Sequence, residues 1–326
     1  MRTTTASQHA PGWLIWSALL VVYLVWGSTY LAIAIVVETM PPLLAAGGRF
    51  LFAGLLIWVT LAVVRGRSGL KLTRGQLVGS TFVGVALLLG GNGMVMLGQR
   101  TVPSGLAALI IAVVPLWVVV LRLLSSEPIR RGTLVGVVVG FAGVALLVAA
   151  RGIAGDVDVV GMLLLVMAGA SWSVGSYYSR RVALPADPFA ASAAQLVLGG
   201  VALLGAGVLT GELGWVAPEE FSAASLVALL YLVFFGSILA YSAYTWLLQN
   251  APVSKVATYA YINPVVAIVL GWLVLNEEFT LAMAVGGAMI VLAVGLVIRT
   301  ESRPARAGAL ESPPAQSALG RLRGAK

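Results

Sequence analysis

The side chains with chemistry to offer a small molecule are polar and aromatic groups placed inside long apolar segments. A Trp or Tyr with an apolar body and a polar tip suits a cavity for an amphipathic organic solute. For any single residue, helix packing or interfacial anchoring is the simpler interpretation. The recurrence of the set in matching segments favours a cavity. The predicted cavity residues are Trp26, Ser28, Tyr30, Asn92, Trp172, Ser176, Tyr241, Tyr244, Tyr259 and Asn263.

The inventory of reactive side chains argues against an enzyme. There is no Cys, and the one histidine, His9, lies in the polar N-terminal tail, so thiolate sites and His-based triads are excluded and imidazole metal ligation is not expected. An intramembrane enzyme would otherwise need two membrane carboxylates, which the spans do not offer. There is also no GxxxxGK[ST] loop to hold ATP. We therefore predict no catalysis, no metal and no cofactor.

The elements that must position these residues are membrane helices. The 326 residues are 60% hydrophobic and 10% charged, whereas soluble domains have about 45–50% apolar and about 25% charged residues. A helix needs about 20 apolar residues to cross the bilayer. Ten segments qualify, at roughly 13–36, 42–64, 76–98, 104–124, 133–150, 159–178, 189–209, 224–248, 254–275 and 281–299.

The charges predict the orientation of these spans. With the N-terminus inside, 17 of the 20 Lys and Arg residues fall in inner segments, only Arg100 and Arg151 fall outside, and Arg49 lies within a span. The positive-inside rule makes this split decisive. We predict a multi-pass protein of the bacterial inner membrane with both termini cytoplasmic. The net charge of +8 is then a topology signal with a role at lipid headgroups, and nucleic acid is not a predicted partner.

The two halves of the chain resemble each other. At an offset of 146, Trp172 repeats Trp26, and Gln195 stands against Arg49. Further along, "GQRTVPSGLAAL" (98–109) matches "LQNAPVSKVATY" (248–259). Each half has five spans, and because five is odd the second half must be inverted relative to the first. Inverted repeats are a common design of secondary transporters.

These residues carry a family resemblance. The paired units, "WGSTY" in the first span, "GRFLFAGLLI" in the second and the long segment that begins "NPVVAIVLGWLVLNEEF" resemble the EamA-type branch of the drug/metabolite transporter superfamily. The resemblance implies an all-α polytopic membrane protein, with ten transmembrane helices in two inverted five-helix repeats around a central cavity. The implied division is a cytoplasmic tail (1–12), a first repeat (13–150), a second repeat (159–299) and a disordered cytoplasmic tail (300–326).

Two prolines mark the middle of matching spans. Pro115 lies in the fourth span and Pro264 in the ninth. A proline inside a helix frees the carbonyl four residues earlier, and paired interruptions are a sequence pointer to a transporter's binding site. The alternative is that the two kinks only shape the bundle. Both interpretations place these helices beside a cavity.

Arg49 lies about 10 Å into the second span, at 1.5 Å per residue from Pro42. A functional interpretation makes it a gate latch or an anchor for a substrate carboxylate, with Glu38 or freed carbonyls as partners. The structural interpretation is a polar clamp between helices. We favour the clamp, because the resembling family places this arginine in a helix outside the inner ring. Gln195 in the twin position fits a clamp that needs hydrogen bonds more than charge.

The combined prediction is an alternating-access secondary transporter. The resemblance implies small organic solutes such as amino acids, nucleosides, metabolites or drugs, moved outward. The alternative is an importer of sugars or carboxylates. No span has a central carboxylate, so we expect passive flux or coupling through a boundary carboxylate such as Glu38. The predicted partners are the solute and the lipid bilayer, and the sequence does not decide between a monomer and a dimer.

Overall fold

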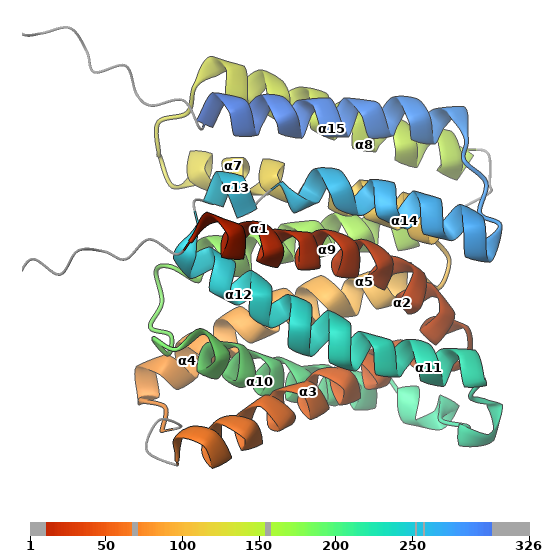
Figure 1. Ribbon diagram of the computed structural model, residues 1–326. Helices are drawn as coiled ribbons and strands as arrows, with labels where there is room; N and C mark the ends of the chain where they lie inside the picture. The colour runs from red at the N-terminus through yellow and green to blue at the C-terminus, as the bar shows by residue number, and fades with distance from the viewer. Residues whose placement is uncertain (1–10, 67–70, 154–157, 252, 257, 302–326) are drawn as a thin grey trace, which may run out of the picture.

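The computed structural model describes residues 11–66, 71–153, 158–251, 253–256 and 258–301. Within these ranges the regular elements are helices (Figure 1). Most of the two predicted terminal tails lies outside the described residues.

The first half of the chain folds into five spans, three of which are built from more than one helical element. Their bounds are α1 (Gly12–Val21), η1 (Val22–Trp26) and α2 (Gly27–Thr39) for the first span, α3 (Pro42–Arg65) for the second, α4 (Arg74–Gly84), η3 (Val85–Gly93) and α5 (Met94–Gly98) for the third, α6 (Ser104–Ile111) and α7 (Val114–Leu124) for the fourth, and α8 (Arg131–Ile153) for the fifth.

The second half repeats this plan. Its bounds are α9 (Val159–Tyr178) for the sixth span, α10 (Pro188–Leu209) for the seventh, α11 (Ala223–Tyr231), η6 (Leu232–Ala240) and α12 (Tyr241–Asn250) for the eighth, α13 (Val253–Val256) and α14 (Tyr259–Leu275) for the ninth, and α15 (Leu281–Glu301) for the tenth. Two short 3₁₀ turns, η4 (Glu212–Trp215) and η5 (Pro218–Glu220), join α10 to α11.

The spans agree with the hydropathy prediction except in the ninth. Among the described residues, nine helices are long and apolar enough to cross a membrane, and Ile262–Leu275 is a shorter apolar helix. This confirms the polytopic all-α fold class. The predicted span 254–275 is divided between α13 and α14, where the Thr258 hydroxyl bonds the Lys255 carbonyl at 2.5 Å and so competes with the helical ladder.

The prolines differ from the prediction in one respect. The fourth span is interrupted between α6 and α7, and Pro115 stands in the first turn of α7, where a missing N–H costs nothing. The predicted break at Pro264 is wrong, because α14 continues through this residue. Pro264 is the sixth residue of α14, so its ring removes a single bond of the second turn.

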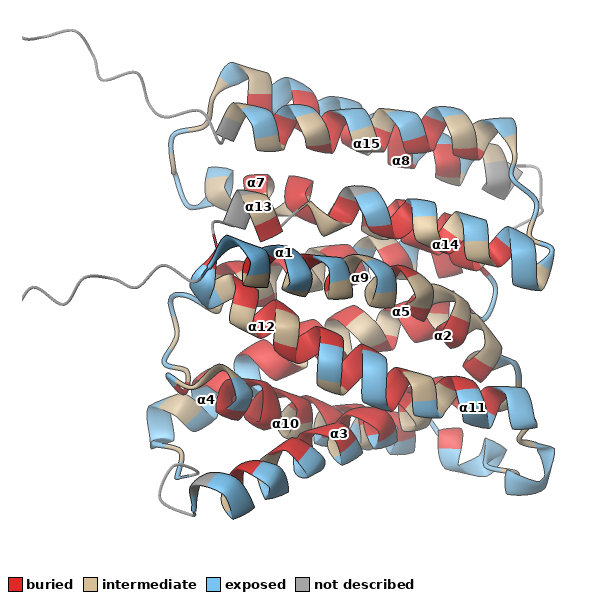
Figure 2. Cartoon of the chain, in the orientation of Figure 1, coloured by how far each residue is buried: buried red, intermediate tan, exposed pale blue. Residues whose placement is uncertain are grey.

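The helices pack side by side in a bundle with an apolar exterior. In Figure 1, α8 lies along α15 on one flank and α3 lies along α10 on the other, with the remaining spans between them. Buried residues face the inside of the bundle, whereas exposed residues cover its outer faces (Figure 2). The exposed positions include large apolar side chains such as Phe52, Val138 and Leu292. Such an exterior requires lipid around it.

The two ends of the bundle can be told apart. Gly12 at the start of α1 and Arg299 near the end of α15 lie at the same end, which we call the inner end after the predicted topology (Figure 1). The loops that carry Glu212 and Glu277 lie at the opposite, outer end. The first spans of the two halves, α1–α2 and α9, therefore run in opposite directions.

Wide π-helical turns interrupt matching spans of the two halves. They are η3 in the third span and η6 in the eighth, and a shorter one, η1, lies in the first span. The Ser237 hydroxyl in η6 bonds the carbonyl of Leu232, five residues back, at 3.0 Å. π-Bulges frequently mark functional sites, because each one re-aims the side chains that follow it.

The pairing of α3 with α10 depends on a small residue and gives a first testable prediction. A Cβ atom on Gly200 would lie 2.6 Å from the backbone nitrogen of Leu51, whereas one on Gly205 of the same helix would meet nothing within 4 Å. Backbone cannot yield as a side chain does, so we expect Gly200→Ala to destabilise the fold by about 1–3 kcal/mol. Gly205→Ala, the matched control, should be neutral or stabilising by up to about 1 kcal/mol.

Thermal unfolding of the two purified variants in detergent measures this difference. Equal unfolding temperatures for Gly200→Ala and Gly205→Ala would contradict the close approach of α3 and α10.

Candidate functional site

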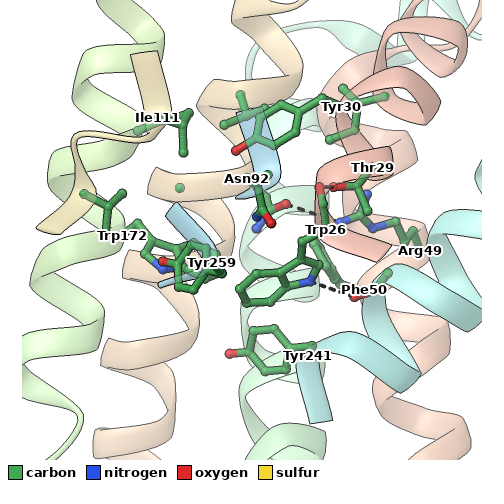
Figure 3. A pocket seen from close by; sticks show the side chains of 17 residues that line it. Trp26, Thr29, Tyr30, Arg49, Phe50, Asn92, Ile111, Trp172, Tyr241 and Tyr259 are labelled. Atoms are coloured by element: carbon green, nitrogen blue, oxygen red, sulfur yellow. Dashed lines mark hydrogen bonds between the residues drawn. The ribbon is translucent and has the colours of Figure 1, made fainter. Parts of the chain in front are cut away.

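A small cavity lies at the centre of the bundle. Its volume is about 80 Å³, enough for a few water molecules and well below the roughly 300–1,000 Å³ of sites for drug-sized ligands. Both halves of the chain contribute to its wall. The lining residues are Trp26, Thr29, Tyr30, Ile33, Arg49, Phe50, Gly91, Asn92, Val95, Ile111, Val114, Ala168, Trp172, Gly236, Tyr241, Tyr259 and Asn263. Figure 3 shows their side chains around the open space and labels ten of them.

Four rings, which we call the aromatic cluster, pack against one another on the inner side of this cavity. They are Trp26, Trp172, Tyr244 and Tyr259, which come from both halves of the chain. The ring of Trp26 lies 5.5 Å from those of Trp172 and Tyr259, edge to face, and 4.8 Å from that of Tyr244. These are favourable aromatic geometries. The Trp26 indole also donates to the carbonyl of Gly236 at 3.3 Å, which fixes its orientation.

Arg49 lines the cavity although its helix, α3, lies on the outer flank of the bundle. The side chain is 4% exposed and extends from α3 toward Asn92 (Figure 3). Its Nε donates to the Ser237 hydroxyl at 3.1 Å, and its Nη2 donates to the side-chain amide oxygen Oδ1 of Asn92 at 3.3 Å. The guanidinium lies 4.1 Å from the centre of the Phe50 ring. Because Asn92 and Ser237 belong to η3 and η6, Arg49 links the π-helical turns of the two halves.

The residues predicted to pair with Arg49 lie elsewhere. Glu38 is exposed on α2 and makes no contact with Arg49, so that predicted pairing is wrong. Its neighbour Thr39 faces α11 and donates to Ser225 at 2.9 Å, and successive helical residues point about 100° apart. Gln195, the twin of Arg49, accepts a hydrogen bond from the Tyr241 hydroxyl at 2.6 Å.

Seven of the ten predicted cavity residues line the cavity, and the other three do not. Ser28 points away, because it lies two residues from both Trp26 and Tyr30, and its hydroxyl meets that of Tyr231 at 2.6 Å. Ser176 and Tyr244 lie one layer further toward the inner end, where their hydroxyl oxygens are 3.2 Å apart. The seven are Trp26, Tyr30, Asn92, Trp172, Tyr241, Tyr259 and Asn263.

Asn263 joins α14 to the first span. With its amide oriented to donate, the nitrogen reaches the carbonyls of Tyr259 at 3.2 Å and Tyr23 at 3.1 Å. The Tyr23 hydroxyl in turn bonds the Thr258 hydroxyl. The ninth span is therefore attached to the first beside the place where α13 gives way to α14.

Sequence reasoning missed the apolar half of the cavity wall. Ile33, Phe50 and Val95 resemble any other core residue, and periodicity alone does not separate a residue that lines a cavity from one that packs. Gly91 could have been predicted as a cavity residue, because it adjoins Asn92 in the sequence. A Cβ atom on Gly91 would lie 2.9 Å from the Trp172 ring, so the glycine makes room for that side chain.

Two larger pockets adjoin the cavity toward the inner end. One, of about 970 Å³, is bounded by Tyr241, Tyr244 and Arg180. The other, of about 670 Å³, is bounded by Tyr244, Tyr259 and Glu127. Tyr241 and Tyr259 each line the cavity and one of these pockets. One layer of aromatic side chains therefore separates the cavity from the two pockets at the inner end.

Carboxylates join helices at the outer end. Asn276 has the left-handed backbone conformation (φ 53°) that ends α14, and the chain turns back so that Glu277 reaches the N-terminus of α6. Its two oxygens accept from the backbone N–H groups of Ser104 at 2.6 Å and Gly105 at 2.9 Å. A carboxylate at a helix N-terminus is stabilised by the helix dipole and by charged hydrogen bonds.

Further contacts reinforce the outer end. Glu212, which is 3% exposed, accepts from the N–H groups of Leu43 at 3.1 Å and Leu44 at 2.9 Å at the start of α3. The Gln99 amide donates to the carbonyl of Tyr30 at 2.9 Å, which ties the third span to the first. The outer end is thus held by direct bonds between spans.

At the inner end Glu127, which stands 150 residues before Glu277, has different partners. Its carboxylate accepts from Arg122 at 2.8 Å, Tyr177 at 2.7 Å and Arg181 at 2.8 Å. The hydrogen bonds from Arg122 and Tyr177 lower the pKa of Glu127 below its ordinary value of 4.5.

This shift predicts a loss of stability in acid. A carboxyl whose pKa is lower in the folded state stabilises the fold above its ordinary pKa, near 4.5, and loses that contribution as the pH falls through the lowered value. We expect the unfolding temperature of the wild type to drop more between pH 6 and about pH 3.5 than that of Glu127→Gln. Equal drops would show that Glu127 does not contribute.

With this geometry in view, the fold and the two-half architecture define a class, the polytopic membrane transporters built from repeated units. The model of the EamA-like transporter family matches residues 13–149 and again residues 159–299. The chain therefore belongs to the EamA-like transporter family, and it is a membrane transporter.

Its relatives agree with this assignment. The inner membrane transporter YedA of Escherichia coli (strain K12) is 37% identical over 284 residues, which cover 87% of this chain and 90% of YedA. The transporter YvbV of Bacillus subtilis (strain 168) is 30% identical over 300 residues, which cover 90% and 95%. A protein of known crystal structure shares the fold, with a TM-score of 0.61 over 90% of this chain and 98% of its own, at 20% identity. The chain is thus a multi-pass inner membrane protein.

Proposed function

We propose that the protein exports small organic solutes from the cytoplasm by alternating access through the central cavity. The observation that carries the proposal is the arrangement of closures around that cavity. On the outer side, Glu277 and Gln99 tie spans together. On the inner side, a layer of aromatic side chains separates the cavity from pockets of about 970 and 670 Å³. A solute can leave the cavity only if one of these closures opens.

The orientation and the unit of transport are part of the proposal. The basic residues of the described inner loops, such as Arg130 and Arg180, lie at the end we call inner, in accord with the positive-inside rule.

The two closures differ in kind, because the outer one is made of hydrogen bonds and the inner one of packed rings. The cavity lies within one chain, so a single chain is sufficient as the unit that moves the solute.

The nature of the cavity supports amphipathic solutes. Rings of the aromatic cluster offer an apolar surface, and Asn92 and Asn263 offer hydrogen bonds. Amino acids, nucleosides, other metabolites and drugs of compact size share this pattern of one apolar and one polar part. The alternative, an importer of sugars or carboxylates, gains support from one observation, which is that Arg49 lines the cavity.

The experiment is a thermal-shift screen followed by flux. A solute that binds the folded protein raises its unfolding temperature. Solutes that do so are then loaded into proteoliposomes, and counterflow is compared with protein-free liposomes. We expect saturable counterflow that is lost in Trp172→Ala and kept in Trp272→Ala, a control on α14 that is 61% exposed. Flux that is unchanged in Trp172→Ala would contradict the assignment of the cavity.

Everted membrane vesicles test the direction. Export from the cytoplasm becomes uptake into such vesicles, so the proposal predicts concentration-dependent uptake there when the solute is added outside. Uptake found only in right-side-out cells would establish the importer instead.

A further inference from the structure

We propose that the guanidinium of Arg49 binds a carboxylate of the transported solute, so that the substrates are small organic acids or zwitterions. The inference rests on the proposed function, because it takes the central cavity to be the transport site. It goes beyond that function by naming the chemical class of the solute and the atom that recognises it.

The first observation is that the charge of Arg49 has no counter-charge in the fold. Its Nε and Nη2 are bonded to uncharged oxygens, those of Ser237 and Asn92. Its Nη1 is buried and has no hydrogen-bond partner. Among the described residues no carboxylate forms an ion pair with it. A buried charge without a partner is costly, and breaking or lacking such a pair is strongly unfavourable.

The second observation is the balance of donors and acceptors in the cavity wall. Of the lining residues within the described chain, Trp172 is the other one whose buried side-chain polar atom, the indole Nε1, lacks a well-formed hydrogen bond, although it lies near the hydroxyls of Tyr244 and Tyr259. Both atoms are N–H donors. A ligand that satisfies them must bring acceptors, and a carboxylate offers about four acceptor positions and no donor.

The geometry of the two groups suits a solute with two ends. The planar guanidinium of Arg can bind both oxygens of a carboxylate at once, a geometry that the ammonium group of a Lys does not offer. The aromatic cluster lies beside it and can take an apolar body, or the ammonium of a zwitterion through cation–π contact. No lining residue is acidic, so the site has no anionic group that would repel the carboxylate.

The competing interpretation is that Arg49 is only a clamp between η3 and η6. A clamp is complete when the bridging bonds are made, as at Gln195, where one hydrogen bond joins α10 to Tyr241. At Arg49 the bridging bonds use Nε and Nη2 and leave Nη1 facing no protein acceptor. The clamp therefore does not explain the third nitrogen, whereas a bound carboxylate does.

The test compares acids with amides of the same shape. Thermal shift and tryptophan fluorescence of the purified protein are measured with acetate against acetamide, benzoate against benzamide, and L-phenylalanine against L-phenylalaninamide. We expect at least one acid to bind about tenfold or more tightly than its amide, because hydrogen bonds to charged groups are the stronger ones. In a separate arm, the same measurements are made with sodium chloride at equal ionic strength. If sodium chloride raises the unfolding temperature as much as the best acid does, Nη1 holds an inorganic anion and the inference is wrong.

Two variants separate binding from folding. Arg49→Gln should lose the preference for the acid, but it removes a bridging group and can also weaken the fold. Asn92→Asp keeps Arg49 and places a carboxylate next to Nη2, so it should fold and should lose acid binding by about tenfold or more, because the charge is now paired internally. Acid binding that is unchanged in a folded Asn92→Asp variant would contradict the inference.

The outcomes also separate this inference from the proposed function. If neutral solutes show saturable counterflow that requires Trp172, while no acid is preferred over its amide, the transporter assignment holds and the role of Arg49 as an anion anchor fails. If neither acids nor neutral solutes show counterflow that requires Trp172, the cavity itself is not the transport site, and both proposals fail.

Discussion

Replacing Trp26 with Ala should reduce transport by about tenfold or more and lower the free energy of unfolding by about 3 kcal/mol. Trp26 touches all three other members of the aromatic cluster, as Tyr244 also does, and of these two residues only Trp26 lines the cavity. Its removal leaves a void beside the cavity that the surrounding helices can fill only in part. The layer that separates the cavity from the inner pockets would then be open in both halves of the transport cycle.

Two comparisons make this prediction specific. Trp13 belongs to the same span and is 70% exposed, so Trp13→Ala should leave transport and stability close to the wild type. Trp26→Phe keeps a ring but loses the bond to the Gly236 carbonyl, and an intermediate loss is expected. Counterflow and thermal unfolding measure both quantities. Equal losses for Trp13→Ala and Trp26→Ala would contradict a special role for the cluster.

Replacing Glu277 with Gln should weaken the outer closure and shift the protein toward a state open to the outside. The carboxylate holds two N–H groups at the start of α6, and loss of such a cap costs about 0.5–2 kcal/mol. Between two conformations that lie close in free energy, about 1.4 kcal/mol changes the ratio tenfold. Transport should fall because one half of the cycle is then favoured over the other.

The adjacent Glu278 is the matched control. It is exposed, and Glu278→Gln changes the same charge without touching α6. Because the chain has no Cys, a single Cys introduced at Ile33 in the cavity wall can be labelled without background. A membrane-impermeant thiol reagent added outside should react faster with this Cys in Glu277→Gln than in Glu278→Gln. Equal labelling rates would show that Glu277 does not close the outer end.

The spans and their repeat could be predicted because they depend on composition along the chain. Hydropathy located the helices, since lipid demands about 20 apolar residues for each crossing. The spacing of four residues is also enough to place Trp26 and Tyr30 on one face of the first span. The same argument would exclude Ser28, because two residues correspond to about 200° around a helix. The sequence prediction included Ser28 because it grouped residues by type.

The features that sequence did not predict depend on contacts between distant segments. Arg49 lines the cavity because α3 lies close to both η3 and η6, and the π-helical turns have no composition signature. The break after α13 lies at Thr258, whose hydroxyl bonds Tyr23 of the first span and the Lys255 carbonyl. The sequence position of Glu38 places it at the outer end of the first span. Which way its side chain points follows only from the contact of the neighbouring Thr39 with α11.

The most direct measurement is the accessibility of a single Cys in the cavity wall from the two sides of the membrane. Ala168 lines the cavity and is fully buried, and Ala168→Cys is a small change. A charged, impermeant thiol reagent should label this Cys both in right-side-out cells and in everted vesicles, and Glu277→Gln should speed labelling from the outside while slowing it from the inside. Labelling from one side alone, whatever the variant, would contradict alternating access to the cavity.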